Sequence, residues 1–277
     1  MKNFKKLLAV LLAGLMLLSL AACGGKDDKV VKVGVLEAGG LNDMRTEEHL
    51  AHMKEELKHS SDVTTEFSTY DNLSTALMDL EAGKIAFISL EESTANYVAA
   101  RNEKVTVNKI DLKTEFSMMT MDTNQEVYDI LNNAIKEMKA DGTLDSLIEN
   151  ELKAYINSDP VAKDLPKFEG AQTIKVGVTG DVPPMDFVAS NGKAAGFNIA
   201  LLAEIANRAQ VNIELVQIET GARAIALSNG KVDAVFWTKG MTCTVCGAEG
   251  AEKVDGTLVT ESYYSDYTAS IMLKSDK

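Results

Sequence analysis

The chain has 277 residues and a formal net charge of −13 at pH 7. That length can bury one sizeable core or two smaller lobes. The excess of acidic residues argues against nucleic-acid binding and against a protein that lies flat on anionic lipid, because both need a basic surface.

The first 22 residues have the pattern of a secretory signal. Three lysines within residues 2–6 precede an apolar run over residues 7–18, which is too short to span a bilayer comfortably. The motif Leu-Ala-Ala-Cys then ends at Cys23 and resembles the lipobox of bacterial lipoproteins, which implies cleavage before Cys23 and a diacylglycerol on its sulfur. We therefore expect a lipid anchor as the only membrane attachment, on the extracytoplasmic face of the cell membrane, with a tether over residues 23–29. The alternative is an ordinary signal with a chance cysteine.

The rest of the chain alternates β-rich runs with helical patterns, which predicts an α/β fold with parallel strands. The expected strands are residues 30–36, 63–67, 85–89, 173–178, 212–216 and 232–237. The expected helices are residues 43–59, 73–80, 197–208 and 223–227, and a long helical stretch over 124–155 that Gly142 interrupts.

Two segments of the chain are similar to each other. Residues 73–88 and 222–235 both have helical spacing, then Gly-Lys, then a β-rich run. We therefore expect two similar α/β lobes, over residues 30–110 and 172–277. Residues 111–171 would hold the hinge return, the closing helices and a connector.

The second lobe carries a family likeness. Residues 173–187 and 191–198 resemble the opening of lobe 1 in bacterial extracellular solute-binding proteins of family 3, the polar amino-acid type. Residues 32–40 and 126–155 resemble that family's lobe 2 and closing helices. The resemblance implies a two-lobed periplasmic-binding-protein type 2 fold with a circularly permuted lobe order. We expect a monomer, and the alternative is two half-proteins that pair between chains.

Ligands of open α/β sheets bind at the carboxyl ends of strands, and here those ends would face a cleft between the lobes. Gly39, Gly40 and Asn42 follow the first strand, where backbone N–H groups could hold a carboxylate or phosphate, or could form a plain tight turn. Glu91 follows the third strand. The resemblance implies that it holds a ligand amino group, and the alternative is a solvated loop acid.

In the second lobe, Asp181 and Met185 follow the first strand, and Trp237 could wall an apolar ligand or belong to the core. The family places an arginine after the strand of Trp237, to clamp a carboxylate. This sequence has Lys239 there instead, and Arg223 on another loop provides the nearest guanidinium.

Cys243 and Cys246 replace that arginine motif. Outside the membrane they could form a structural disulfide or stay as free thiols, and one such pair without further ligands is weak support for zinc or redox chemistry. We expect no metal and no cofactor.

The resemblance implies that the chain delivers a small polar solute, an amino acid or a related compound, to the permease of an ABC importer. We expect no enzymatic activity and no nucleic-acid partner. One alternative is a dehydratase-like enzyme that would use Glu91 and Asp181 as acid and base. The other is a sensor or scaffold lipoprotein that no longer binds solute.

Overall fold

The computed structural model describes residues 29–36, 63–159, 161–189, 191–243, 249–250 and 254–274. The expected helix over 43–59 and the expected signal segment lie outside these residues. Within them, no helix has the length and apolar character needed to cross a membrane.

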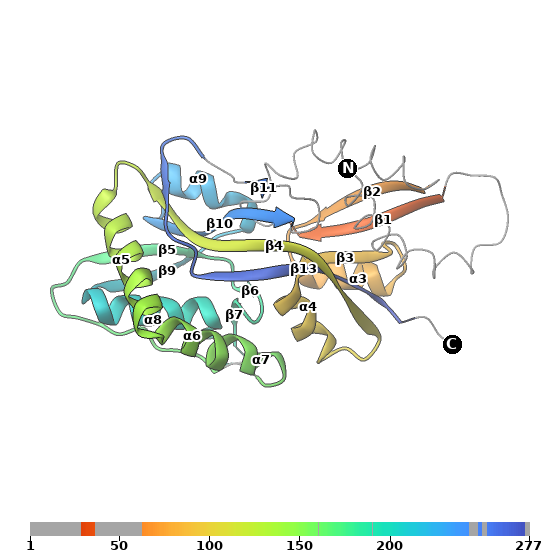
Figure 1. Cartoon of the computed structure of the whole chain (residues 1–277), viewed down its shortest axis with the longest axis horizontal. Coiled ribbons are helices and arrows are strands. Elements are labelled where there is room, and N and C mark those ends of the chain that lie inside the picture. The colour runs from red at the N-terminus through yellow and green to blue at the C-terminus, as the bar shows by residue number, and fades with distance from the viewer. Residues whose placement is uncertain are drawn as a thin grey trace.

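One large mixed sheet runs through the molecule, in the order β2-β1-β3-β13-β4-β10-β5-β9, with β11 paired to β10 and β12 paired to β4. Its strands are β1 (Lys29–Leu36), β2 (Val63–Tyr70), β3 (Phe87–Glu91), β4 (Val105–Met121), β5 (Thr173–Val178), β9 (Asn212–Gln217), β10 (Ala234–Cys243), β11 (Glu249–Gly250), β12 (Thr257–Val259) and β13 (Tyr264–Leu273). The long strands β4 and β13 lie side by side and connect the two ends of the sheet (Figure 1).

The first lobe contains β1, which pairs in parallel with β2 and β3. Helices α3 (Leu73–Glu81) and α4 (Glu92–Ala99) cover this part of the sheet. The Asn72 side chain caps α3 by accepting a hydrogen bond from the Thr75 N–H at 2.9 Å. Leu73, Ala76 and Leu80 then have the spacing that buries one helix face in the core of this lobe.

The second lobe contains β5, which pairs in parallel with β9 and β10. Its remaining elements are α5 (Gln125–Asp141), α6 (Thr143–Leu147), η1 (Ile148–Lys153), α7 (Ala154–Ile156), β6 (Asp181–Val182), β7 (Asp186–Val188), β8 (Ala194–Ala195), α8 (Phe197–Ala209), η2 (Thr220–Ala222) and α9 (Arg223–Ser228). Gly142, at φ +79°, separates α5 from α6 in a left-handed conformation that glycine adopts without strain.

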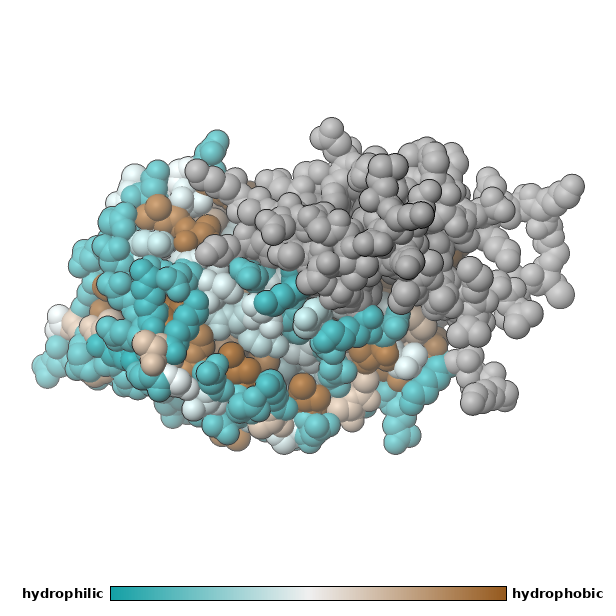
Figure 2. Space-filling view, in the orientation of Figure 1, coloured by the Kyte–Doolittle hydropathy of each residue, from teal (hydrophilic) through white to brown (hydrophobic). Residues whose placement is uncertain are grey.

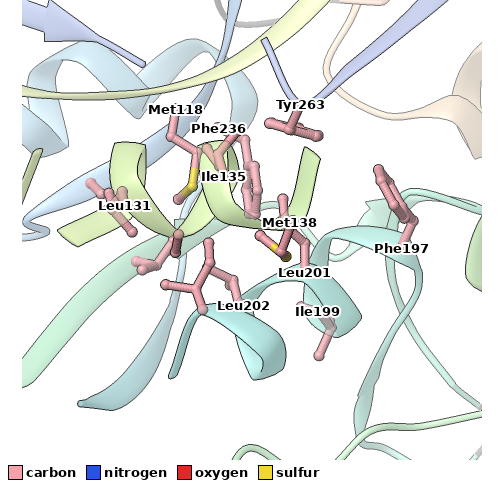
Figure 3. Packing of buried hydrophobic residues seen from close by; sticks show 14 of the residues in the cluster. Met118, Leu131, Ile135, Met138, Phe197, Ile199, Leu201, Leu202, Phe236 and Tyr263 are labelled. Carbon is pink, nitrogen blue, oxygen red and sulfur yellow. The ribbon is translucent and has the colours of Figure 1, made fainter. Parts of the chain in front are cut away.

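The core of the second lobe lies between α5, α8 and the sheet. Leu131, Ile135 and Met138 of α5 point toward Leu201 and Leu202 of α8 (Figure 3). The opposite side of α5 is polar, and hydrophilic residues cover much of the surface around this helix (Figure 2). This amphipathic pattern fixes which face of α5 packs inward.

Both lobes have the same strand order. In the first lobe, β13 inserts antiparallel between β3 and β4, which gives β2-β1-β3-β13-β4. In the second, β4 inserts antiparallel between β10 and β12, which gives β9-β5-β10-β4-β12. Each lobe therefore receives one strand from the chain segment that builds the other lobe.

Several predicted strand boundaries were wrong. The strand expected at 85–89 is Phe87–Glu91, so Glu91 ends the strand instead of following it. The strand expected at 232–237 begins at Ala234 and continues to Cys243, because pairing with β4 extends it. The boundary expected at residue 110 falls inside the continuous strand β4.

Candidate ligand-binding site

A cavity of about 70 Å³ lies where the two lobes meet. The first lobe contributes Leu36, Asp71, Asn72, Glu91 and Thr94 to its lining. The rest of the lining comes from Phe116 of β4 and from Thr179, Asp181, Val182, Met185, Asp186, Asn198, Arg223, Phe236, Trp237 and Tyr263.

Parallel strands bring several of these residues together. Leu36 and Glu91 end β1 and β3, Asp71 directly follows β2, and Thr179 directly follows β5. The carboxyl ends of the parallel strands of both lobes therefore face the same cavity, as the geometry of open α/β sheets predicts.

A buried carboxylate holds the loop after β5. Asp186 accepts hydrogen bonds from the backbone N–H groups of Thr179 at 2.9 Å and Gly180 at 3.1 Å. Burial raises the pKa of Asp186, and these hydrogen bonds and the charge of Arg223 oppose that rise. The loop is thereby fixed at both ends, with Asp181 between them.

The start of α8 packs directly against the same loop. Phe197 N–H donates to the Pro184 carbonyl at 3.1 Å, and Asn198 N–H donates to the Met185 carbonyl at 2.8 Å. Gly196 has φ +107°, and a Cβ there would lie 2.6 Å from the Met185 oxygen. A glycine is required for this approach.

Arg223 is the first residue of α9, and its guanidinium lines the cavity. Its Nη1 donates to the Phe236 carbonyl at 3.4 Å. Burial lowers the pKa of Arg223, whereas the charges of Asp186, Asp181 and Glu91 raise it. The guanidinium therefore lies within electrostatic range of three carboxylates.

Three buried polar atoms of the lining residues have no hydrogen-bond partner: Thr94 Oγ1, Asp181 Oδ1 and Trp237 Nε1. Thr94 is fully buried and Trp237 is 4% exposed. Most buried polar groups in folded proteins are paired, so these three atoms are candidates for contact with a bound molecule. Ser93 Oγ, Ser117 Oγ and Thr120 Oγ1, whose residues do not line the cavity, are also buried without a partner. Burial also raises the pKa of Asp181, although a hydrogen bond with Thr179 and the charge of Arg223 oppose this.

Aromatic rings form the apolar part of the wall. Phe236 and Tyr263 pack edge to face, with ring centroids 5.9 Å apart, and both also belong to the core of the second lobe (Figure 3). The Tyr263 hydroxyl donates to Asn198 Oδ1 at 3.2 Å. The wall is therefore anchored by the core on one side and by a hydrogen bond on the other.

The position of Thr94 depends on a strand from the other end of the chain. Asp266 of β13 is buried and accepts a hydrogen bond from the Ser93 N–H at 3.0 Å, at the start of α4. A carboxylate is favourable at a helix N-terminus, where backbone N–H groups lack helical partners. Asp266 therefore positions the helix turn that carries Thr94.

Five residues proposed from the sequence, Glu91, Asp181, Met185, Arg223 and Trp237, line this one cavity. Lys239 and Cys243 lie in β10, where only their backbone is described. The remaining candidates, Cys23, Gly39, Gly40, Asn42 and Cys246, lie outside the described residues, so the anchor and the disulfide stay predictions.

Sequence reasoning missed several lining residues. Asp71 and Asn72 directly follow β2, and the strand-end rule that selected Glu91 would also have found them. Thr94 and Asp186 carry no such signal, because helix packing and loop hydrogen bonds bring them to the cavity.

One sequence-family model matches part of the chain. The sequence model of "Bacterial extracellular solute-binding proteins, family 3" matches residues 174–277, which is less than half of the chain. No curated protein matches the chain in sequence.

Many solved structures are similar to this chain, and three of them, each with a TM-score below 0.5, are given as examples. The ligand-binding component of an ABC-type import system from Staphylococcus aureus, with zinc bound, has 11% identity and a TM-score of 0.43, and the match covers 87% of this chain and 65% of that one. The probable amino-acid ABC transporter extracellular-binding protein of Bacillus subtilis has 13% identity and a TM-score of 0.45, with coverages of 91% and 87%. The effector-binding domain of QuiR in complex with shikimate has 10% identity and a TM-score of 0.44, with coverages of 91% and 90%.

Proposed function

We propose that this chain is an extracytoplasmic solute-binding protein that captures a small polar molecule between its lobes and presents it to an ABC importer. The three unpartnered polar atoms around the inter-lobe cavity carry this proposal, because a bound solute would supply their missing partners. The family match over the second lobe supports the same function.

The strands between the lobes suit a hinge. The register of β13 against β4 shifts between Tyr267 and Ala269, and that of β10 against β4 shifts between Thr238 and Gly240. Such irregularities allow a local change of backbone direction. The lobes would close about them when solute binds, which draws an open–closed equilibrium toward the closed form.

We further propose that Cys23 carries the lipid anchor on the extracytoplasmic face of the membrane. The anchor would precede the first lobe, whereas the family match falls on the second lobe at the other end of the chain. We propose that the lobe order is permuted relative to that family, because residues 173–187 and 191–198 resemble the opening of its lobe 1. The partner would be a permease that recognises the closed monomer.

A thermal-shift screen of the full chain, purified in detergent, tests the proposed function. The screen would use amino acids, amines, peptides, nucleobases and organic acids. A specific solute at 100 times its Kd should raise the free energy of unfolding by about 2.7 kcal/mol. No shift with any class of solute would contradict solute binding, and turnover of a bound compound would favour an enzyme.

A further inference from the structure

The cavity between the lobes has a strongly unbalanced charge. Its described lining contains four carboxylates, from Asp71, Glu91, Asp181 and Asp186, and one guanidinium, from Arg223. The formal net charge of these side chains is therefore −3. Because the site is partly screened from water, this charge acts on a bound molecule more strongly than the same charges would on an open surface.

A hollow next to the cavity is acidic as well. This hollow, of about 390 Å³, shares Asp71 and Asp181 with the cavity and adds Glu219. Its other lining residues are Asn72, Thr179, Gln217 and Ile218, so its described lining has three carboxylates and no basic side chain. A solute that enters by this route first meets negative charge, which attracts cations and repels anions.

The one guanidinium is already compensated within the protein. Arg223 lies in the electric field of Asp186, Asp181 and Glu91, and its Nη1 donates to the Phe236 carbonyl. A carboxylate brought by a solute would therefore compete with three resident carboxylates for the same positive charge. The main effect of Arg223 is therefore to neutralise part of the negative charge of the lining. Its contribution to binding an anion is smaller.

The groups without partners define where the solute would bind. Asp181 Oδ1 is a buried acceptor, and a charge-assisted hydrogen bond from an ammonium or guanidinium would satisfy it. Trp237 Nε1 is a buried donor that needs an acceptor such as a hydroxyl or carbonyl oxygen, and Thr94 Oγ1 can take either role. The rings of Phe116, Trp237 and Tyr263 in the wall are also favourable surfaces for a cation.

We infer that the solute is a small organic cation, an amine or guanidine that carries more positive than negative charges and has a hydrogen-bond acceptor beside its cationic group. This inference rests on the proposed function and narrows it. Its amine or guanidine binds Asp181, and its acceptor binds Trp237 and Thr94. An α-carboxylate is not required.

Isothermal titration calorimetry with compounds matched in shape tests the charge requirement. L-lysine and L-lysinamide carry the extra positive charge, L-norleucine lacks it, and L-2-aminoadipate replaces it with a negative one. Agmatine adds a guanidine to the cationic compounds, glutamine adds a zwitterion and glutamate adds an anion. We expect the tightest cationic compound to bind at least about tenfold more tightly than any zwitterion, and the anionic compounds to bind most weakly.

Tightest binding by a zwitterion or an anion would overturn the inference and leave the proposed function standing. Absence of binding by all three charge classes would contradict both. These outcomes are distinguishable in one set of titrations.

Two variants test the assigned acids. Asp181→Asn should reduce the affinity for the cationic compound by at least about tenfold and lower its selectivity over the matched zwitterion, because the variant removes one charge and keeps the shape. Glu219→Gln should slow association and weaken its dependence on salt. Asp145→Asn, on the exposed face of α6, is the matched control and should change neither. Unchanged cation affinity in both Asp181→Asn and Glu219→Gln would contradict the inference.

Discussion

At the residue scale, two aspartates five positions apart have different environments. Both oxygens of Asp186 accept backbone N–H groups, whereas Asp181 has a buried oxygen without a partner. Asp186 therefore holds the loop, and Asp181 is available to a solute. Local sequence does not separate the two roles, because both residues are aspartates near the end of the same strand.

Replacing Asp186 should destabilise the fold. Asp186→Ala leaves the N–H groups of Thr179 and Gly180 without their acceptor, and a buried unsatisfied group costs about 1–3 kcal/mol. We expect urea unfolding to show a loss of about 2–4 kcal/mol. Asp181→Ala is the control and should lose less than Asp186→Ala, since Asp181 Oδ1 has no protein partner and only the hydrogen bond with Thr179 is removed. Equal losses in the two variants would contradict the division of roles.

Binding should also depend on pH through Asp181. Burial raises the pKa of this carboxyl, against the Thr179 hydrogen bond and the charge of Arg223. A cation binds the ionised form, so its affinity should be full above that raised pKa and fall about tenfold per pH unit below it. Calorimetry between pH 4.5 and 7.5 measures this. The dependence should flatten in Asp181→Asn, and an unchanged profile in that variant would assign it to another group.

At the element scale, Arg101 connects the lobes away from the cavity. From the end of α4, its guanidinium donates to the carbonyls of Ile156 at 2.7 Å, Ser158 at 2.7 Å and Tyr155 at 3.3 Å. A cation is favourable at such a helix C-terminus, where carbonyls lack helical partners. The guanidinium also lies 3.6 Å from the ring centroid of Tyr97.

Removing this contact should favour the open arrangement of the lobes. Arg101→Ala eliminates all three hydrogen bonds, so small-angle scattering of the solute-free protein should give a larger radius of gyration than wild type. Lys104→Ala is the control, because it removes only a surface ion pair with Glu81 at 3.4 Å. An unchanged radius in Arg101→Ala would show that the contact does not hold the lobes.

The bounds of helices and strands with a strong local sequence pattern were predicted well. The strand at 173–178 was predicted with its observed bounds, and α8 ends one residue after Arg208, the expected end of this helix. The 17-residue strand β4 was not predicted. Its middle section alternates Lys109, Lys113 and Glu115 with other residues, and only pairing with β13 and β10 makes it one strand. Such pairing joins distant segments and leaves little local signal.

At the scale of the whole molecule, the strand-end rule explains how much of the site could be predicted. It accounts for Glu91, Asp181 and Met185, because both lobes direct the carboxyl ends of their parallel strands inward. Trp237 lies within β10 and Arg223 begins α9, so the rule does not explain these two candidates. It could not place Thr94, which depends on Asp266 from β13. That strand crosses from the second half of the chain into the first lobe, and no local pattern specifies such a crossing.

The exchange of β4 and β13 also bears on the state of the protein in solution. Both strands pair within one chain, so the molecule needs no second copy to complete its sheet. We expect light scattering with size-exclusion chromatography to give the mass of a monomer. An obligate dimer would instead support strands exchanged between chains.

Mass spectrometry of the same sample should find the lipid on Cys23.

The most direct test uses Trp237, the one tryptophan of the chain, which lines the cavity and is 4% exposed. Its fluorescence reports on this site without a label. If a solute binds between the lobes, titration should change the emission saturably, with the same Kd that calorimetry gives. A solute that binds by calorimetry and leaves the emission unchanged would place its site elsewhere and contradict the account.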